Sequence, residues 1–442
     1  MSLTAKFTKG DISGHIINMA LTNVIGLSVF FIVDLVDIYF ISVLNQPLLL
    51  SAIGYAAAIL FFTTSITIAM MIANSVVVAR MIGQQRYQQA KQAAMSCYVL
   101  TFIFSLLVSF FIFCNADTLL TFLGATGDEL QAASEYLSIT LIAFPIVALG
   151  MQITSTLRAL GRAKLSMYCT ITAGVVNIIL DPLMIFYFEL DLKGAAFASL
   201  MAKSTMLLIA VYYLLINVKF ITKVGFTAFK KQTQFILKVA IPVSLTQLAT
   251  PLSQLYITYE IAKFGPSYVA GWAIISRLIP VVFMMLFAMP GAIGPIISQN
   301  LGAMQFKRVR KTLNQSLNFI IKYVFVLALT LSLLQEYLIS LFNALNGTAV
   351  MIRFFCQYIS ISFIFVAMNL VAMSFLNNVG YPKLASMLNL SKMSLGIIPF
   401  VSIGAYYYGV QGILVGQALG SVVFAIISIT ICYQILRKLD YN

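Results

Sequence analysis

The sequence has 442 residues, of which 61% are hydrophobic and only 9% are charged. Soluble domains carry roughly 25% charged residues, so this composition excludes a soluble globular protein and indicates an integral membrane protein. The net charge of +14 does not indicate nucleic-acid binding, because the basic residues gather in alternate gaps between apolar segments. Five scattered cysteines and one histidine, His15, form no metal-ligand pattern, so we expect no cofactor.

Long apolar segments follow one another along the chain and alternate with short polar breaks. A membrane-spanning helix needs about 20 predominantly apolar residues, and a helix satisfies its own backbone hydrogen bonds in hydrocarbon. Twelve segments meet this description, beginning near residues 15, 50, 92, 131, 164, 194, 235, 268, 312, 350, 384 and 411. The fold is therefore predicted to be an all-α integral membrane protein with twelve transmembrane helices.

Basic residues mark the side of the membrane on which each connection lies. Arg80 and Arg86 follow the second segment, Arg158 and Arg162 follow the fourth, and Lys307 follows the eighth. The intervening connections are neutral or acidic. Because basic loops remain in the cytoplasm, we expect both termini to be cytoplasmic in a multi-pass protein of the prokaryotic cytoplasmic membrane.

The chain also repeats itself at a constant spacing. Gly83 and Gly302 are 219 residues apart in similar surroundings, as are Gly161 and Gly380. This repeat predicts two lobes of six helices, residues 1–218 and 239–442, joined by a basic cytoplasmic linker, 219–238. Because each half has an even number of spans, a pseudo-two-fold axis along the membrane normal should relate them. Duplications of this kind are typical of transporters that work by alternating access.

Acidic residues inside two of the apolar segments are the candidate functional residues. Asn177 and Asp181 are four residues apart in NIILDPLMIF, so they share one helix face, and Pro182 loosens the helix beside them. Asp34 and Asp37 share a face in the first segment. A carboxylate at the centre of a spanning helix costs about 2.5 kcal/mol or more. Such residues normally mark an ion or substrate path.

Structural roles for these acids remain as alternatives. Asp181 could be hydrogen-bonded to backbone at the proline bend, and Asp37 could lie at the membrane interface. Asp34 could be a second ion-binding acid or a structural partner of the first. We expect Glu260, near a helix end, to be solvated.

Several segments resemble the multidrug and toxic compound extrusion (MATE) family, in its DinF-like branch. They are NIILDPLMIF (177–186), LKGAAFAS (192–199) and VDIYFI (36–41). The resemblance implies export of cationic or lipophilic drugs and other toxic organic compounds in exchange for H⁺ or Na⁺. It also implies a cation site at Asp37, Asn177, Asp181 and Ser199. The first three would also contact substrate, and all four would be Na⁺ ligands if sodium is the coupling ion. Asp34 is a lesser candidate for that site, from its place beside Asp37 and not from the resemblance.

The sequence departs from the family pattern in three places. Thr22 occupies the place of a frequent proline in the first helix, which puts bending at that point in doubt. Ser199 stands where many members have threonine. Another branch has acids near Thr250 and Met368, and the second-half counterpart of NIILDP is GIIPFV (396–401). Since none of these three places holds an acid here, we expect ion coupling in the first lobe only.

Other function classes fit the residues less well. A flippase for lipid-linked saccharides, the alternative function, should line its cavity with cations, but those within the spans are dispersed: Lys203, Arg277, Lys322 and Lys392. A membrane enzyme needs a nucleophile–base pair, and the lone His15 supplies none. The sequence therefore predicts a secondary active antiporter, not an enzyme, that works as a monomer in the lipid bilayer on small organic cations or drugs.

Overall fold

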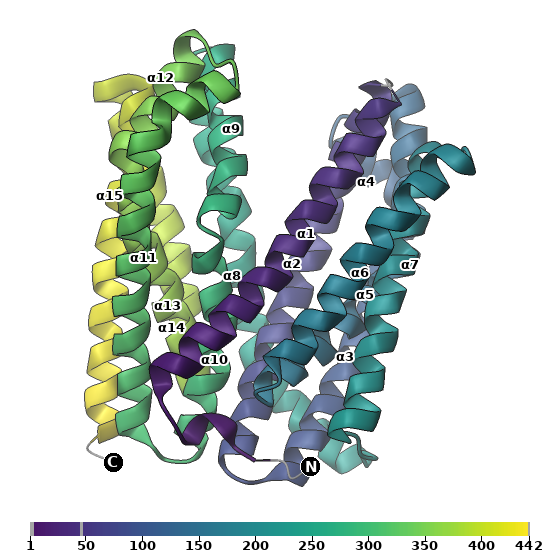
Figure 1. Cartoon of the computed structure of the whole chain (residues 1–442), viewed down its shortest axis with the longest axis vertical. Helices are drawn as coiled ribbons and strands as arrows, with labels where there is room; N and C mark the ends of the chain where they lie inside the picture. Colours follow the sequence, from purple (N-terminus) through teal and green to yellow (C-terminus); the bar gives the residue numbers. More distant parts are fainter. Residues whose placement is uncertain (1–3, 45–46, 441–442) are drawn as a thin grey trace. The chain divides into compact units, whose positions relative to one another are not determined.

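The computed structural model describes residues 4–44 and 47–440, and every regular element in these ranges is helical. The α-helices, followed in Figure 1, are α1 (Ile12–Val43), α2 (Pro47–Gly83), α3 (Tyr87–Cys114), α4 (Ala116–Phe122), α5 (Gly127–Ala159), α6 (Ala163–Pro182), α7 (Asp191–Tyr212), α8 (Phe226–Ala262), α9 (Pro266–Val282), α10 (Met284–Gly302), α11 (Phe306–Leu341), α12 (Asn346–Phe354), α13 (Phe363–Val379), α14 (Pro382–Ser391) and α15 (Ile398–Asp440). Short 3-10 helices are η1 (Lys6–Thr8) and η5 (Ser360–Ser362). Turns of π-helix are η2 (Leu183–Tyr187), η3 (Tyr213–Val218), η4 (Phe355–Ile359) and η6 (Lys392–Ile397).

The described residues contain twelve apolar segments that can cross a membrane. Ten are continuous helices of sufficient length and hydropathy, and α9 with α10 forms one more, bent by 42°. The longest of the ten, Pro382–Leu439, covers 58 residues, far more than the roughly 20 that a bilayer requires, and it folds back on itself. The prediction of an all-α membrane protein with twelve spans is confirmed.

The fold-back in α15 is a helical hairpin closed at Gly409, whose φ of 58° and ψ of −141° break the helix. A Cβ atom added at Gly412 would overlap the carbonyl oxygen of Gly404, and one added at Gly416 would overlap that of Phe400. Gly420 approaches Gly396 in the same way. Each of these pairs is centred on residue 408, so the two arms run antiparallel in one fixed register. Glycine permits the close backbone approach that holds helices together in lipid.

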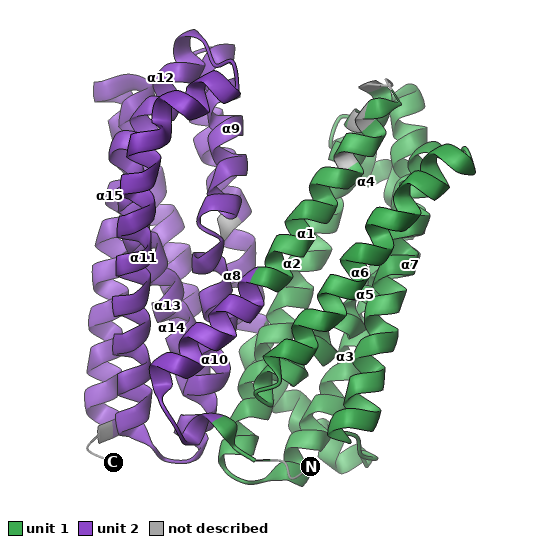
Figure 2. Cartoon of the chain, in the orientation of Figure 1, with its two compact units in different colours: residues 1–6, 25–240 green, residues 7–24, 241–442 purple. Residues whose placement is uncertain are grey.

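Two compact units make up the chain, and they are coloured separately in Figure 2. One consists of residues 1–6 and 25–240, and the other of residues 7–24 and 241–442. The first part of α1 therefore belongs to the second unit, although the predicted first lobe covered all of 1–218. The predicted linker 219–238 is mostly helical, because α8 begins at Phe226. The predicted lobe boundaries stay a prediction.

Side-chain hydrogen bonds hold the start of α1 in the second unit. The Phe7 amide donates to Gln299 Oε1 over 3.0 Å, and Asn300 Nδ2 donates to the Phe7 carbonyl over 3.1 Å. The Arg308 guanidinium donates to the carbonyls of Phe7, at 2.9 Å, and Gly10, at 3.0 Å. A guanidinium presents several donors in a rigid fork, so one side chain fixes the segment that leads into α1.

We predict that Gly412→Ala destabilises the hairpin, since the new methyl group meets the backbone of the other arm, which cannot move aside cheaply. Overpacking of this kind costs about 1–3 kcal/mol, and the melting temperature in detergent should fall. Gly54→Ala on α2 is the matched control, because nothing lies within 4 Å of the added atom. An unchanged melting temperature for Gly412→Ala would contradict the hairpin packing.

Candidate functional site

The two helices that carry the predicted acids lie side by side in the first unit. A Cβ atom added at Gly174 on α6 would overlap Val29 of α1, and the Phe40 and Phe186 rings meet edge to face at 5.9 Å. The residue numbers in these contacts differ by 145 and 146, so α1 and α6 run parallel in a fixed register. That offset places Asp37 beside residues 182–183, directly after Asp181.

Asp37 and Asp181 also lie at the same level along their helices. Asp37 is six residues before Val43 at the end of α1, and Asp181 is six residues before Tyr187 at the end of η2. At 1.5 Å per residue, each carboxyl group is about 9 Å from its helix end. Both therefore lie within the membrane-spanning part of the first unit.

Asn177 and Asp181 share one helix face, as their spacing predicts, and they are hydrogen-bonded to each other. Asn177 Nδ2 donates to Asp181 Oδ1 over 3.2 Å, and the two residues are 2% and 0% exposed. Pro182 is the last residue of α6, and the π-turn η2 follows it. Because proline has no backbone N–H to donate, the change in helix geometry falls directly after the buried carboxyl group.

The carboxyl groups of Asp37 and Asp181 face one another within hydrogen-bonding reach. Asp37 Oδ1, Asp181 Oδ2 and Asn177 Oδ1 are nevertheless buried without a hydrogen-bond donor from the described residues. The carboxyl groups can face each other and still lack donors, because an ionised carboxylate can only accept hydrogen bonds. A proton or a small cation among these oxygens would supply what they lack, and their acceptor-only chemistry fits such an ion.

Lys203 and Tyr136 join this cluster and were not assigned to it from the sequence. The Lys203 ammonium on α7 lies within electrostatic range of Asp34 and Asp37. Tyr136 on α5 lies close to both of these acids and to Asp181. The spacing of Lys203 from Ser199, four residues along one helix, could have revealed the lysine. Nothing in the sequence around Tyr136 distinguishes it.

The remaining predicted residues lie at the edges of the cluster. Ser199 is half-buried on α7, whose start packs closely on α6, since a Cβ atom added at Gly194 would be 2.6 Å from the Met184 carbonyl oxygen. Asp34 is exposed on α1, one turn before Asp37. The ion-binding roles of Asp37, Asn177, Asp181, Ser199 and Asp34 stay predictions.

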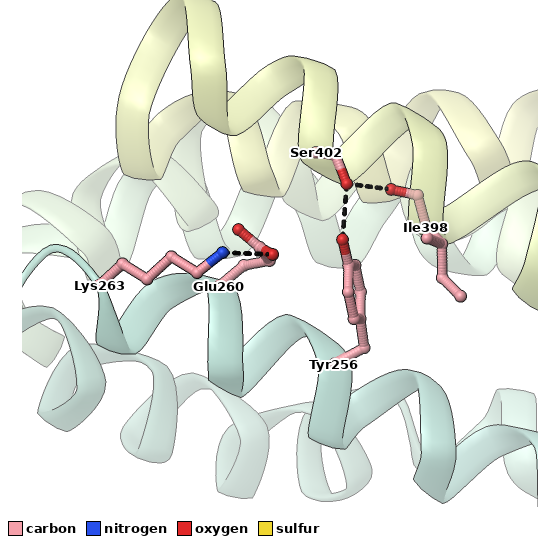
Figure 3. Close-up of polar contacts among 5 residues, drawn as sticks. All are labelled: Tyr256, Glu260, Lys263, Ile398 and Ser402. Carbon is pink, nitrogen blue, oxygen red and sulfur yellow. Dashed lines mark hydrogen bonds and ion pairs between the residues drawn. The ribbon is translucent and has the colours of Figure 1, made fainter.

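The prediction that Glu260 is solvated is wrong. Glu260 is only 6% exposed, and Lys263 Nζ donates to its Oε1 over 2.8 Å, as Figure 3 shows. Helix α8 continues to Ala262, so Glu260 lies inside its last turn, where the lysine one turn later can neutralise it. Of the two positions predicted to lack acids, Met368 is half-buried, and the Thr250 side chain lies outside the described residues.

Comparison with known proteins decides the family. The MatE family profile matches residues 22–183 and again residues 242–401, which together make up most of the chain. The chain belongs to the MatE family. Its two matched segments begin 220 residues apart, which confirms the internal duplication predicted from the glycine spacing of 219. MatE proteins are transporters, so this chain is a membrane transporter of the efflux type and not an enzyme.

Individual relatives agree with this membership over nearly the whole chain. The FAD transporter of Shewanella oneidensis is 27% identical over 434 residues, covering 96% of this chain and 94% of the relative. The multidrug export protein MepA of Staphylococcus aureus is 22% identical, covering 99% and 97%. The crystal structure of the Vibrio cholerae MATE transporter VcmN in the bent form superposes with a TM-score of 0.92 at 23% identity, covering 97% and 98%. This last likeness shows the fold.

We predict that cysteines placed at 37 and 181 bind one mercuric ion together. The double variant Asp37→Cys/Asp181→Cys is made with Cys114→Ala, because Cys114 is the exposed native cysteine and the other four are buried. Hg²⁺ should protect both new thiols from alkylation, as measured by mass spectrometry, because two facing side chains can ligate it together. Each single cysteine variant is the control. Independent alkylation of the two thiols in the presence of Hg²⁺ would contradict the facing arrangement.

Proposed function

We propose that this MatE-family transporter is a secondary active antiporter that exports organic compounds in exchange for protons bound at Asp37 and Asp181. The observation that carries the proposal is the pair of facing carboxyl groups on two parallel helices, each with a buried oxygen that lacks a donor among the described residues. Two carboxyl groups can hydrogen-bond to each other only when one of them carries a proton. The pair therefore has two distinct arrangements, one with a shared proton and one without.

Loss of the shared proton changes the forces at the site. Two carboxylates in contact repel one another strongly in a medium of low dielectric constant, so Asp37 on α1 and Asp181 on α6 then favour separation or a positively charged ligand. Asn177 keeps Asp181 in place through its amide hydrogen bond. Ser199 would supply a further hydroxyl. Lys203 lies close enough to the α1 acids to offset part of their charge while the site is empty of substrate.

A single proton is sufficient for useful transport. One elementary charge that crosses a membrane potential of 100 mV supplies about 2.3 kcal/mol. Because a tenfold concentration ratio corresponds to about 1.4 kcal/mol, one proton per cycle maintains a gradient of roughly fifty-fold for an uncharged substrate. Exchange of one proton for a monovalent cation is electroneutral, so the pH gradient drives it instead, at about tenfold per pH unit.

The named relatives and the positions of the charged residues support a class of substrate and a location for the protein. Relatives named as a multidrug export protein and as an FAD transporter support organic compounds as substrates, and the acidic cluster favours cationic drugs among them. The basic connections support a position in the cytoplasmic membrane with both termini inside. Protons from the outside would then reach the site near the outer ends of α1 and α6.

We expect Asp37→Asn and Asp181→Asn each to reduce proton-driven ethidium transport in proteoliposomes by tenfold or more, since an amide cannot release the exchanged proton. Asp128→Asn, at an exposed acid in the first turn of α5, is the control and should retain transport. Separate proton and sodium gradients are imposed on the same vesicles.

Three outcomes would contradict the proposal in different ways. Full gradient-driven transport by both Asn variants would show that neither acid takes part in the coupling step. Transport driven by the sodium gradient alone would show that Na⁺, and not H⁺, is the coupling ion. Movement of a lipid-linked saccharide without any ethidium transport would favour the flippase instead.

A further inference from the structure

The structure separates the four basic residues that the sequence analysis placed within spans into three kinds. Arg277 and Lys322 are exposed on the surfaces of α9 and α11. Lys203 lies near the acids of the first unit. Lys392, the first residue of the π-turn η6, differs from the other three, because it lies on a packed helix face of the second unit.

The neighbours of Lys392 on its own helix define that face. One turn before it, Leu388 is buried, and Asn389 Nδ2 donates to the Thr246 carbonyl of α8 over 3.0 Å. One turn after it, a Cβ atom added at Gly396 would be 2.8 Å from the Phe424 ring. Lys392 therefore lies on the face that packs against α8 and α15. It is ten residues after Pro382, which places it about 15 Å along the span.

No acid of the second unit whose side chain the structure describes is available to neutralise Lys392. Residues 7–24 and 241–442 contain four acids: Asp11, Glu260, Glu336 and Asp440. Glu260 is paired with Lys263 (Figure 3), and Glu336 is paired with Arg353 at 2.8 Å. Asp11 precedes α1 and accepts from the Gly14 amide. Asp440 ends α15, and its side chain lies outside the described residues.

The Lys392 ammonium thus makes no hydrogen bond and no ion pair with any described residue. A charged side chain inside a membrane span is costly and normally marks a substrate or ion path. An ammonium also presents three donors and no acceptor. Its natural partner is an anion, and the described residues do not provide one.

The internal repeat makes the helix face of Lys392 the counterpart of the acidic helix face in the first unit. The two corresponding faces therefore carry charges of opposite sign. With the offset of 219, Lys392, Gly396 and Phe400 correspond to Ala173, Asn177 and Asp181. The helix pairs are also equivalent. The contacts Thr246–Asn389 and Tyr256–Ser402 (Figure 3) have offsets of 143 and 146 residues, and the α1–α6 contacts have offsets of 145 and 146.

We propose that Lys392 binds the phosphate or carboxylate group of a transported compound, so that organic anions and zwitterions belong to the substrate range. This inference rests on the proposed export function. The packed helix face, the absence of an acid partner among the described residues and the equivalence to the acidic face of the first unit support it together. The first unit binds the coupling ion, and Lys392 selects substrate by charge.

The test compares two probes in the same proteoliposomes: FAD, which carries a pyrophosphate, and ethidium, a permanent cation. Lys392→Met should reduce FAD transport by tenfold or more and change ethidium transport by less than twofold. Lys392→Arg should keep most FAD transport, since it keeps the charge. Lys322→Met, at an exposed lysine on α11, is the matched control and should leave both probes unchanged.

A binding measurement separates recognition from loss of folding. Quenching of flavin fluorescence by detergent-purified protein should show FAD binding weakened by tenfold or more in Lys392→Met, with a melting temperature close to that of the unmodified chain. Equal losses of FAD and ethidium transport, or unchanged FAD binding, would overturn the proposal. If the unmodified chain moves ethidium but neither moves nor binds FAD, this inference fails and the proposed export function stands.

Vesicle composition distinguishes a substrate anion from a lipid headgroup. The comparison is made in vesicles of phosphatidylcholine alone and in vesicles that also contain phosphatidylglycerol. A substrate site requires the Lys392→Met effect to persist in both. An effect that appears only with phosphatidylglycerol would show that Lys392 binds lipid and would overturn the substrate assignment.

Discussion

The cost of placing ionisable groups in hydrocarbon is the constraint on which the rest of this structure depends. A buried charge needs a partner, because the surrounding lipid offers none. In the first unit, Asp37 and Asp181 meet this need only when a proton or cation lies between them. The close contact of Gly174 with Val29 sets the register that makes them face each other. Helix packing thereby brings two unfavourable residues together as one facing pair, the ion site proposed above.

The duplicated scaffold carries different chemistry in its two halves. Tyr256 lies at the position equivalent to Asp37, and it makes a neutral hydrogen bond with Ser402 where the first unit has a pair of acids. Lys392 introduces a positive charge on the helix equivalent to the one that carries Asp181. Duplication preserved the parallel helix pairs and their offsets, while substitution left facing acids in one unit and a lysine in the other.

Features that depend on local spacing could be predicted from the sequence. Apolar run length predicted twelve spans, and the separation of four residues predicted that Asn177 and Asp181 share the helix face on which they are hydrogen-bonded. Features that depend on tertiary packing could not. The approach of Asp37 to Asp181 requires the α1–α6 register, and the approach of Lys203 to the acids requires the placement of α7. The burial of Glu260 depends on packing around the last turn of α8, where Lys263 pairs with it.

The hairpin at Gly409 has a consequence for biogenesis. Its arms are joined without an intervening loop, and their contact is made by backbone atoms along the glycines from Gly396 to Gly420. Such a contact needs no other helix to complete it, so the two arms can pair as they leave the translocon and partition into lipid as one body. The hairpin would then be a preformed surface against which the other helices of its unit can pack.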